Sequence, residues 1–451
     1  MNIDYILNGN LFKVWNKFVL ASVVGVVLNA VYTIVDGIFV GQGVGETGLA
    51  GVNLAWPAVT IILGLGLMLG IGASSLISIA LGQNNLEQAE KILGTVLKFS
   101  LVLGVGLMVI GLLFSKPITS LLGASSDTFK HTQNYFFVIY LMAIPYLLAN
   151  TLGPLVRAAG NPKLSMIMVG VGAIGNIVLD WLFVICLKGG TGGAALATGA
   201  GVILSSVVGI HYFTFGNASI KLHRKHFSLD KEILLSIIKI GFVSLVVQLS
   251  IGLVILIQNK IIYLYGNTSD IAIFSVAGYI ISLYTQLCVG ISQGMQPLIG
   301  YHLGASKIKR MRSILWITLC VSFLCGIIAV STLAIYGRSF ISFFGISGDI
   351  LSLAYNRTLI FCIGAPFIGI VYTVSAYYQA LNRNVAANII SITRGFILQA
   401  GFSLILPPFI GVDGIFYAQC LSDFLGIFMI FIVLGFTYVC EKLKTKKELS
   451  I

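Results

Sequence analysis

Apolar stretches long enough to cross a lipid bilayer recur along almost the whole chain, and short polar segments separate them. A membrane-spanning helix needs about 20 predominantly apolar residues. Runs of that length fall at roughly 14–40, 49–81, 92–115, 132–155, 164–187, 192–216, 235–265, 271–303, 313–335, 353–380, 386–406 and 413–439. The pattern predicts an all-α polytopic membrane protein with twelve transmembrane helices.

The composition excludes several other classes of protein. Of the 451 residues, 57% are hydrophobic and only 9% are charged, which no soluble globular class matches. The net charge of +12 does not indicate a nucleic-acid partner, because Lys and Arg lie in short loops between the spans. The sequence has no nucleophile–base set, nucleotide-binding loop or metal-binding motif. We therefore expect neither an enzyme nor a bound cofactor.

The basic residues also predict an orientation. When the first span runs outward, 21 of the 27 Lys and Arg residues lie on one side of the membrane. The positive-inside rule then places both termini in the cytoplasm, and no small-residue cleavage site suggests a removed signal peptide. The polar stretch 217–234 is expected to be a cytoplasmic linker, and residues 440–451 a cytoplasmic tail.

The two halves of the chain resemble each other. An offset of 222 residues aligns residues 81–82 with residues 303–304, both Leu-Gly, and aligns Ala158 with Ala380. Each half contains six expected helices, so both repeats begin on the same side of the membrane. The repeat predicts an N-lobe at 1–216 and a C-lobe at 235–439, related by a pseudo-two-fold axis along the membrane normal. Transporters that rock two lobes around a central cavity have this architecture.

Two carboxylates, Asp36 and Asp180, lie inside runs that are otherwise apolar. An acid inside the bilayer is costly, and it indicates an ion or proton site by default. At about 1.5 Å per residue, Asp36, Asp180 and Thr198 lie roughly 10–12 Å below the outer ends of their helices. Asn176 precedes Asp180 by one helical turn on the same face. The pattern predicts a cluster of oxygen ligands at one depth.

Such a cluster suits a hard monovalent cation or a proton, because a buried carboxylate gains affinity for both. Asn29 and Tyr32 share a helical face with Asp36 and are expected to lie beside it. The alternative is that the two acids are hydrogen-bonded core residues. The internal repeat argues against that alternative, because the residues at the four corresponding positions of the second half are not acidic. They are Gln258 for Asp36, Leu398 for Asn176, Phe402 for Asp180 and Gln419 for Thr198.

Two motifs carry a resemblance to a known family. Residues 35–41 (VDGIFVG) resemble the first-helix motif of MATE (multidrug and toxic compound extrusion) transporters, and residues 158–163 (AAGNPK) resemble the loop after the fourth helix of that family. The positions of Asn176, Asp180 and Thr198 resemble the N-lobe cation site of the MepA-like and DinF-like branches. The resemblance covers nearly the whole chain, including the twelve-helix, two-lobe plan.

The resemblance implies an exporter that uses inward flow of Na⁺ or H⁺ to expel organic, mostly cationic compounds. It implies a coupling site, and a site for Na⁺ where that is the ion, at Asp36, Asn176, Asp180 and Thr198. It also places Tyr135 and Asn150 around that site.

The chain departs from the family pattern at two places. Ala21 stands where many members have a first-helix proline. The spans at 235–265 and 353–380 contain no carboxylate, whereas some branches carry acids there. Coupling through acids in these two spans is therefore not expected.

One further pair of charges lies within the C-lobe spans. Arg394 and Asp423 fall at similar depths on antiparallel helices, so we expect them to form an ion pair. The pair can be a structural lock between two helices, or it can act as a gate or a second coupling site.

These observations favour a monomeric secondary multidrug antiporter of the bacterial cytoplasmic membrane, surrounded by lipid and linked to antibiotic resistance. Its coupling ion is H⁺ or Na⁺, and its partners are small organic cations or drugs. The main alternative is a flippase for a lipid-linked oligosaccharide or a cell-wall precursor, which would need several cavity cations for phosphate. A second alternative is an ion channel or a receptor-like membrane protein, and current without saturable exchange would support it.

Overall fold

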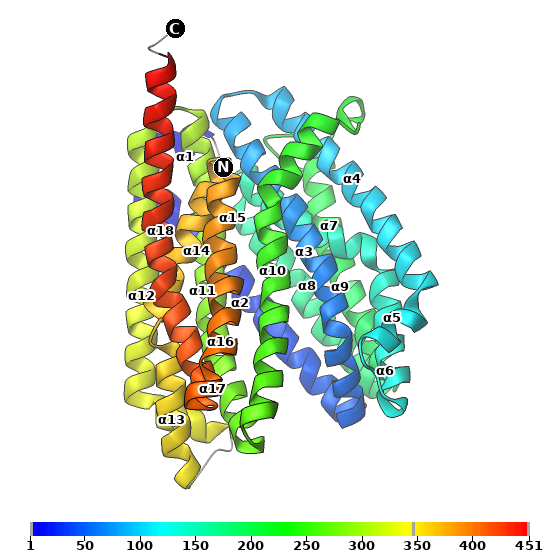
Figure 1. Cartoon of the computed structure of the whole chain (residues 1–451). Coiled ribbons are helices and arrows are strands. Elements are labelled where there is room, and N and C mark those ends of the chain that lie inside the picture. Colours follow the sequence, from blue (N-terminus) through cyan, green and yellow to red (C-terminus); the bar gives the residue numbers. More distant parts are fainter. Residues whose placement is uncertain (1–2, 345–347, 449–451) are drawn as a thin grey trace. The chain divides into compact units, whose positions relative to one another are not determined.

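A computed structural model describes residues 3–344 and 348–448, and every regular element within these residues is a helix (Figure 1). Among the described residues, eleven helical segments are long and apolar enough to cross a membrane. A twelfth span results when the bent pair α6 (Ser126–Leu141) and α7 (Ala143–Ala158) is taken as one. The predicted all-helical, polytopic fold is confirmed.

The first half of the chain contains most of the expected spans as single helices. Their bounds are α2 (Leu11–Gly43), α3 (Glu46–Gly82), α4 (Leu86–Leu113), α8 (Pro162–Asp180) with its π-helical extension η1 (Trp181–Cys186), and α9 (Gly190–Thr214). Two short helices, α1 (Ile3–Asn8) and α5 (Ser115–Leu121), were not predicted. Both are too short for a hydropathy pattern of spanning length to reveal them.

The second half begins after the linker. Its helices are α10 (Lys231–Tyr265), α11 (Thr268–Gly304), α12 (Ile308–Phe343), α13 (Asp349–Cys362), α14 (Ala365–Ala380), α15 (Asn384–Ile392), the π-helical turn η3 (Thr393–Leu398), α16 (Gln399–Ile405), α17 (Pro407–Ile410) and α18 (Asp413–Glu448). The backbone of α18 remains helical to Glu448, beyond the predicted end of the last span. Residues 449–451 of the predicted tail lie outside the described residues.

The prediction of a continuous helix at 132–155 was wrong. The chain bends by 61° between α6 and α7, next to Met142. Pro145 explains the break, because a proline ring clashes with the carbonyl four residues earlier, here that of Leu141, where α6 ends. The equivalent span of the second half has a milder break, because Ile350–Ala380 remains one span without a sharp bend. There α13 ends at Cys362, four residues before Pro366.

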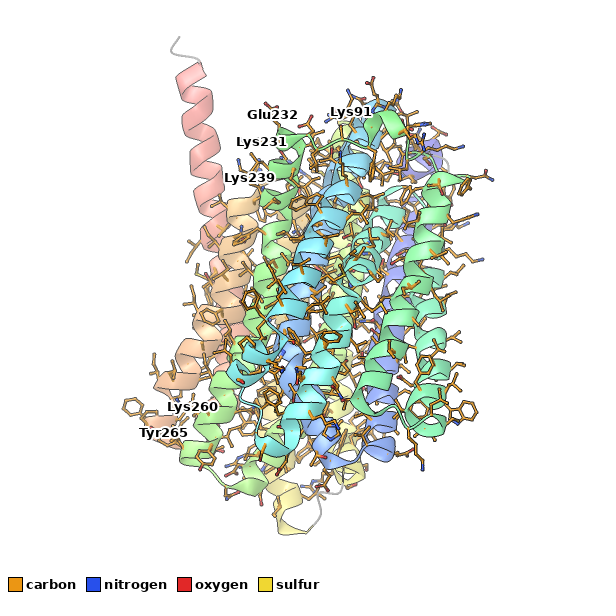
Figure 2. All side chains as sticks on the ribbon, turned by 90° about the vertical axis from the view of Figure 1, so that its right-hand side faces the viewer. Lys91, Lys231, Glu232, Lys239, Lys260 and Tyr265 are labelled. Carbon is orange, nitrogen blue, oxygen red and sulfur yellow. The ribbon has the colours of Figure 1, made fainter. Side chains whose placement is uncertain are left out.

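The linker is shorter than predicted and is attached to α4. It contains a single 3₁₀ turn, η2 (Arg224–His226), and α10 already begins at Lys231. The backbone N–H of Lys221 donates to Oε1 of Glu90 on α4 at 3.1 Å. Figure 2 shows polar residues at both ends of α10. Lys231, Glu232 and Lys239 lie toward the linker, and Lys260 and Tyr265 lie toward the other end.

The chain divides into two compact units. The first comprises Met1–Leu249, Gln293–Ile314 and Ala380–Asn382, and the second comprises Ser250–Ser292, Leu315–Gln379 and Arg383–Ile451. Helices α10 and α11 therefore contribute residues to both units. Within the first unit, glycines allow close backbone packing: Gly241 of α10 lies against the Met68 carbonyl of α3, and Gly304 of α11 lies against the Ile79 carbonyl.

Candidate cation-binding site

The site lies within the first unit, where α2 packs against α8 and η1. The close approach is possible because Gly43, at the end of α2, has no side chain. A Cβ at that position would lie 2.6 Å from Cγ1 of Val184 in η1. Asp36 precedes Gly43 by about two turns, so this packing brings its side chain toward the carboxyl end of α8, where Asp180 lies.

The two carboxylates are buried together. Asp36 is 8% exposed and Asp180 is 0% exposed. Their carboxyl groups are close enough to interact electrostatically. Two buried carboxylates at short range cannot both stay ionised without a compensating positive charge. The pair therefore requires a proton or a bound cation.

Asn176 and Thr198 complete the arrangement, and their hydrogen bonds fix the direction of the Asn176 amide. Thr198 Oγ1 donates its proton to the Ala194 carbonyl at 3.0 Å, so it accepts from Asn176 Nδ2 at 3.3 Å. The carbonyl oxygen Oδ1 of Asn176 is left without a hydrogen-bond partner among the described residues. The amide thus presents an oxygen as a ligand.

The helix crossing that permits this bond is made by glycines. A Cβ at Gly201 of α9 would lie 2.6 Å from the Gly172 carbonyl oxygen of α8 and 3.2 Å from Cβ of Asn176. Small residues let membrane helices approach this closely. Figure 1 shows α8 and α9 side by side, in agreement with their contacts. The sequence alone did not predict the role of these two glycines.

Four buried oxygen atoms in this region lack a hydrogen-bond partner among the described residues. They are Asp36 Oδ1, Asn176 Oδ1, Asp180 Oδ1 and Asp180 Oδ2. Buried polar atoms are nearly always satisfied, and leaving one unsatisfied is costly. Carboxylate and amide oxygens are suitable ligands for a proton or a hard cation. We call Asp36, Asn176, Asp180 and Thr198 the first-half cluster.

The helix changes its winding directly after Asp180. Residues Trp181–Cys186 form a π-helical turn, at whose end the Leu187 N–H donates to the Leu182 carbonyl, five residues earlier, at 2.9 Å. Such turns insert a residue into an α-helix and are frequent at functional sites. Nothing in the hydrophobic pattern of 164–187 distinguishes this turn from an ordinary helix.

Three tyrosines lie near the carboxylates. Tyr32 and Tyr135, both named from the sequence, interact electrostatically with Asp36 and Asp180. Tyr146, which the sequence analysis missed, interacts with Tyr32, Tyr135 and Asp36. The bend between α6 and α7 determines where Tyr146 lies, so its place near the acids could not be predicted without knowing of that bend.

The other two expected neighbours make hydrogen bonds within their own helices. Asn150 is half-buried, and its Nδ2 donates to the Tyr146 carbonyl at 2.9 Å, so it supports a tyrosine backbone. Asn29 is exposed, and its backbone carbonyl accepts from Thr33 at 2.9 Å.

The second unit contains the predicted pairing of Arg394 with Asp423. Asp423 Oδ1 accepts from Arg394 Nε at 2.9 Å and from Nη2 at 2.5 Å. Asp423 Oδ2 accepts from Gln419 Nε2 at 3.0 Å, and Gln419 Oε1 accepts from Gln399. We call Arg394, Gln399, Gln419 and Asp423 the second-half cluster.

A further ion-pair group in the second unit was not predicted. Arg357 of α13 pairs with Asp270 of α11 at 2.5 Å and with Asp413 of α18 at 2.6 Å. Asp270 and Asp413 lie at the starts of α11 and α18, and Arg357 lies within α13, so the sequence offers no reason to connect the three positions.

Several known proteins are similar to this chain. The MatE family model matches residues 21–182 and 242–405. The multidrug export protein MepA of Staphylococcus haemolyticus is 25% identical over 432 residues, which is 95% of each chain. MepA of Staphylococcus aureus strain MSSA476 is 26% identical over 93% of this chain and 92% of its own.

Solved structures show the same fold. A crystal structure of MATE in complex with MaL6 has a TM-score of 0.90 at 22% identity, covering 98% of this chain and 100% of the other. An outward-facing multidrug resistance MATE family transporter of the MOP superfamily has a TM-score of 0.88 at 23% identity, covering 96% and 98%. The family match extends over both halves of the sequence, and this multi-pass membrane protein belongs to the MatE family.

Proposed function

We propose that this chain is a secondary multidrug exporter that couples the inward flow of H⁺ or Na⁺ to the expulsion of organic, mostly cationic compounds. The observation that supports this proposal most directly is the group of four unpartnered buried oxygens in the first-half cluster. Its relatives named multidrug export protein MepA support the export of drugs.

In the proposed cycle, Asp36 and Asp180 take up a cation while the site is open to the outside. Neutralising the two carboxylates removes their repulsion, and this changes the packing of α2 against α8. The two arrangements then differ in affinity for a cationic substrate, as coupling between two ligands requires. The nearby tyrosines would hold such a substrate by cation–π contact while the acids are ionised.

The proposal includes a cytoplasmic location of both termini and the linker, because basic residues are concentrated on that side. It also takes the two six-helix lobes, 1–216 and 235–439, as the parts that move. Bacterial relatives support a location in the cytoplasmic membrane, where the exporter would contribute to antibiotic resistance as a monomer.

The flippase alternative is less well supported. A lipid-linked sugar carries phosphate, and its carrier needs available cations. Arg394, which the sequence suggested as a deep basic residue, is neutralised by Asp423. It therefore offers no free charge to a phosphate.

The test is ethidium efflux from cells that express the chain, with Na⁺ jumps and pH jumps applied separately. Asp36→Asn and Asp180→Asn are each compared with Asp127→Asn, which changes an exposed carboxylate at the start of α6. We expect both site variants to lose gradient-driven efflux and Asp127→Asn to keep it. Unchanged efflux in the site variants would assign the acids to structure, and absence of any organic-cation transport would contradict the proposed function.

A further inference from the structure

One face of α10 combines exposed lysines with exposed apolar side chains. Lys231, Leu235, Lys239 and Phe242 are all exposed, and they follow one another at spacings of four, four and three residues. Such spacings place side chains on one face of a helix. Figure 2 shows Lys231 and Lys239 toward the linker end of α10. The face is therefore basic near the start of the helix and apolar further along.

The internal repeat gives α2 a similar face. At the offset of 222 residues, Lys17 corresponds to Lys239, and Leu20 corresponds to Phe242. Lys13 lies one turn before Lys17, and all three of these α2 residues are exposed. The acids of the first-half cluster do not recur in the second half, whereas this basic and apolar face does. The recurrence indicates a role that both halves share.

The four lysines of the two faces have no anionic partner in the protein. None of their ammonium groups makes an ion pair or a hydrogen bond with another described residue. Neighbouring lysines of α4 differ in this respect. The Lys91 ammonium lies 3.0 Å from the Glu87 carboxylate, and that of Lys98 donates to the Phe227 carbonyl at 3.4 Å. The lysines of the two faces are thus available to an anion from outside the protein.

The surroundings of the α10 face are positively charged. Residues 217–239 contain five Lys and Arg residues but only two acids, Asp230 and Glu232. The carboxylate of Asp230 is engaged, because its Oδ1 accepts from the backbone N–H groups of Glu232 and Ile233 at 3.0 and 3.1 Å. Charge complementarity therefore favours an anionic occupant.

Helix stability does not explain the lysines. Lys13 and Lys231 lie in the first turns of α2 and α10, where the helix dipole disfavours a positive charge. Lys239 lies eight residues beyond Lys231, about 12 Å along the helix axis, within the apolar span Lys231–Tyr265. A lysine on the outside of such a span extends its ammonium toward the lipid headgroups. The anion within reach there is a lipid phosphate.

We infer that the α2 and α10 faces bind anionic phospholipids, with the phosphate at the lysines and the acyl chains along the apolar part of each face. The lysine pairs are Lys13 with Lys17 and Lys231 with Lys239. Headgroups with a net negative charge attract basic residues at the membrane surface, whereas a zwitterionic headgroup carries a compensating positive charge. These lipid faces are separate from the first-half cluster and do not depend on the proposed function.

The test measures lipid binding by the full chain, purified in detergent and freed of bound lipid. The chain is titrated with dioleoyl phosphatidylglycerol, with dioleoyl phosphatidylcholine, or with sn-glycerol 3-phosphate, which has a phosphate but no acyl chains. Native mass spectrometry counts the bound molecules. The wild type is compared with two variants of the lipid faces and with a control that removes two other exposed lysines. These are Lys13→Gln/Lys17→Gln, Lys231→Gln/Lys239→Gln and the control Lys130→Gln/Lys260→Gln.

We expect the wild type to bind phosphatidylglycerol more tightly than phosphatidylcholine. Each variant of a lipid face should lose about tenfold or more in phosphatidylglycerol affinity at that face, and the control should stay within about twofold. An equal loss in the control would show that net charge alone attracts the lipid, and it would overturn the inference. Binding of glycerol 3-phosphate as tight as that of the lipid would also overturn it.

The wild type by itself provides a further decisive result, which requires no variant to fold. Equal affinity of the wild type for the two lipids would contradict an anionic lipid site. Thermal unfolding in detergent shows whether each variant is folded, and these substitutions of exposed side chains should leave its midpoint unchanged.

Discussion

Asn176 of α8 donates a hydrogen bond to Thr198 of α9, and the Thr198 hydroxyl in turn donates a hydrogen bond to the Ala194 carbonyl. This sequence of donors turns the oxygen of the Asn176 amide away from Thr198. Thr198→Val removes the acceptor while keeping the shape of the side chain. A hydrogen bond contributes about 1 kcal/mol on average, so we predict roughly five- to tenfold weaker apparent cation affinity. The half-saturating cation concentration for ethidium efflux measures this, and Thr198→Ser, which keeps the hydroxyl, serves as the control. Equal losses in both variants would argue against a role for the hydrogen bond.

The glycine crossing of α8 and α9 gives a second prediction. Gly201→Leu would push α9 away from the Gly172 carbonyl, which a Cβ would approach to 2.6 Å. Overpacking of this kind costs about 1–3 kcal/mol. We expect a lower thermal-unfolding midpoint together with weaker cation dependence of efflux. Gly106→Ala on α4 is the control, because no atom of the described residues lies within 4 Å of its added Cβ. A Gly201→Leu variant with normal coupling would show that the crossing need not be so close.

The two acids that pair with Arg357 are predicted to contribute unequally to stability. The Asp270 side chain is 10% exposed and that of Asp413 is 47% exposed. Removing the partner of a buried charge is strongly destabilising, whereas an exposed pair contributes about 0–1 kcal/mol. Asp270→Asn should therefore lower the thermal-unfolding midpoint in detergent clearly more than Asp413→Asn does. The reverse order would mean that the exposed pair carries most of the stabilisation.

If Na⁺ and H⁺ bind the same oxygens, they must compete. Protonation of Asp36 or Asp180 removes a ligand for Na⁺, so lower pH weakens Na⁺ binding. In the limiting range the apparent dissociation constant for Na⁺ rises up to about tenfold for each unit decrease in pH, as mass action at a shared site requires. Equilibrium binding of ²²Na⁺ to the purified chain across pH 5–9 measures this. Substantial Na⁺ binding that does not change with pH would place the Na⁺ ligands elsewhere.

The sequence predicts the fold well where hydrophobicity alone determines structure. Helices of spanning length follow from apolar runs, and the polar segments mark their ends. The hydrophobic pattern did not predict the bend near Pro145. That bend depends on a clash between the proline ring and one carbonyl, and a hydropathy average over the whole span does not detect it. It also missed η1, since a π-helical turn has the same composition as the surrounding helix.

Part of the candidate site could also be predicted from the sequence. Asp36 and Asp180 are conspicuous because acids in apolar runs are rare. The similar depths of Arg394 and Asp423 on antiparallel helices likewise predicted their ion pair, which the structure contains. Tyr146 and the Gly172–Gly201 crossing could not be inferred, because their positions depend on how bent and crossing helices pack in three dimensions.

The central claim is that Asp36 and Asp180 couple a cation gradient to drug export. The most direct measurement compares two kinds of ethidium transport by the purified chain in proteoliposomes: exchange without any ion gradient, and accumulation driven by an imposed Na⁺ or H⁺ gradient. For Asp36→Asn/Asp180→Asn we predict that gradient-driven accumulation falls at least tenfold while exchange remains measurable. Accumulation at the wild-type level in that variant would contradict the account.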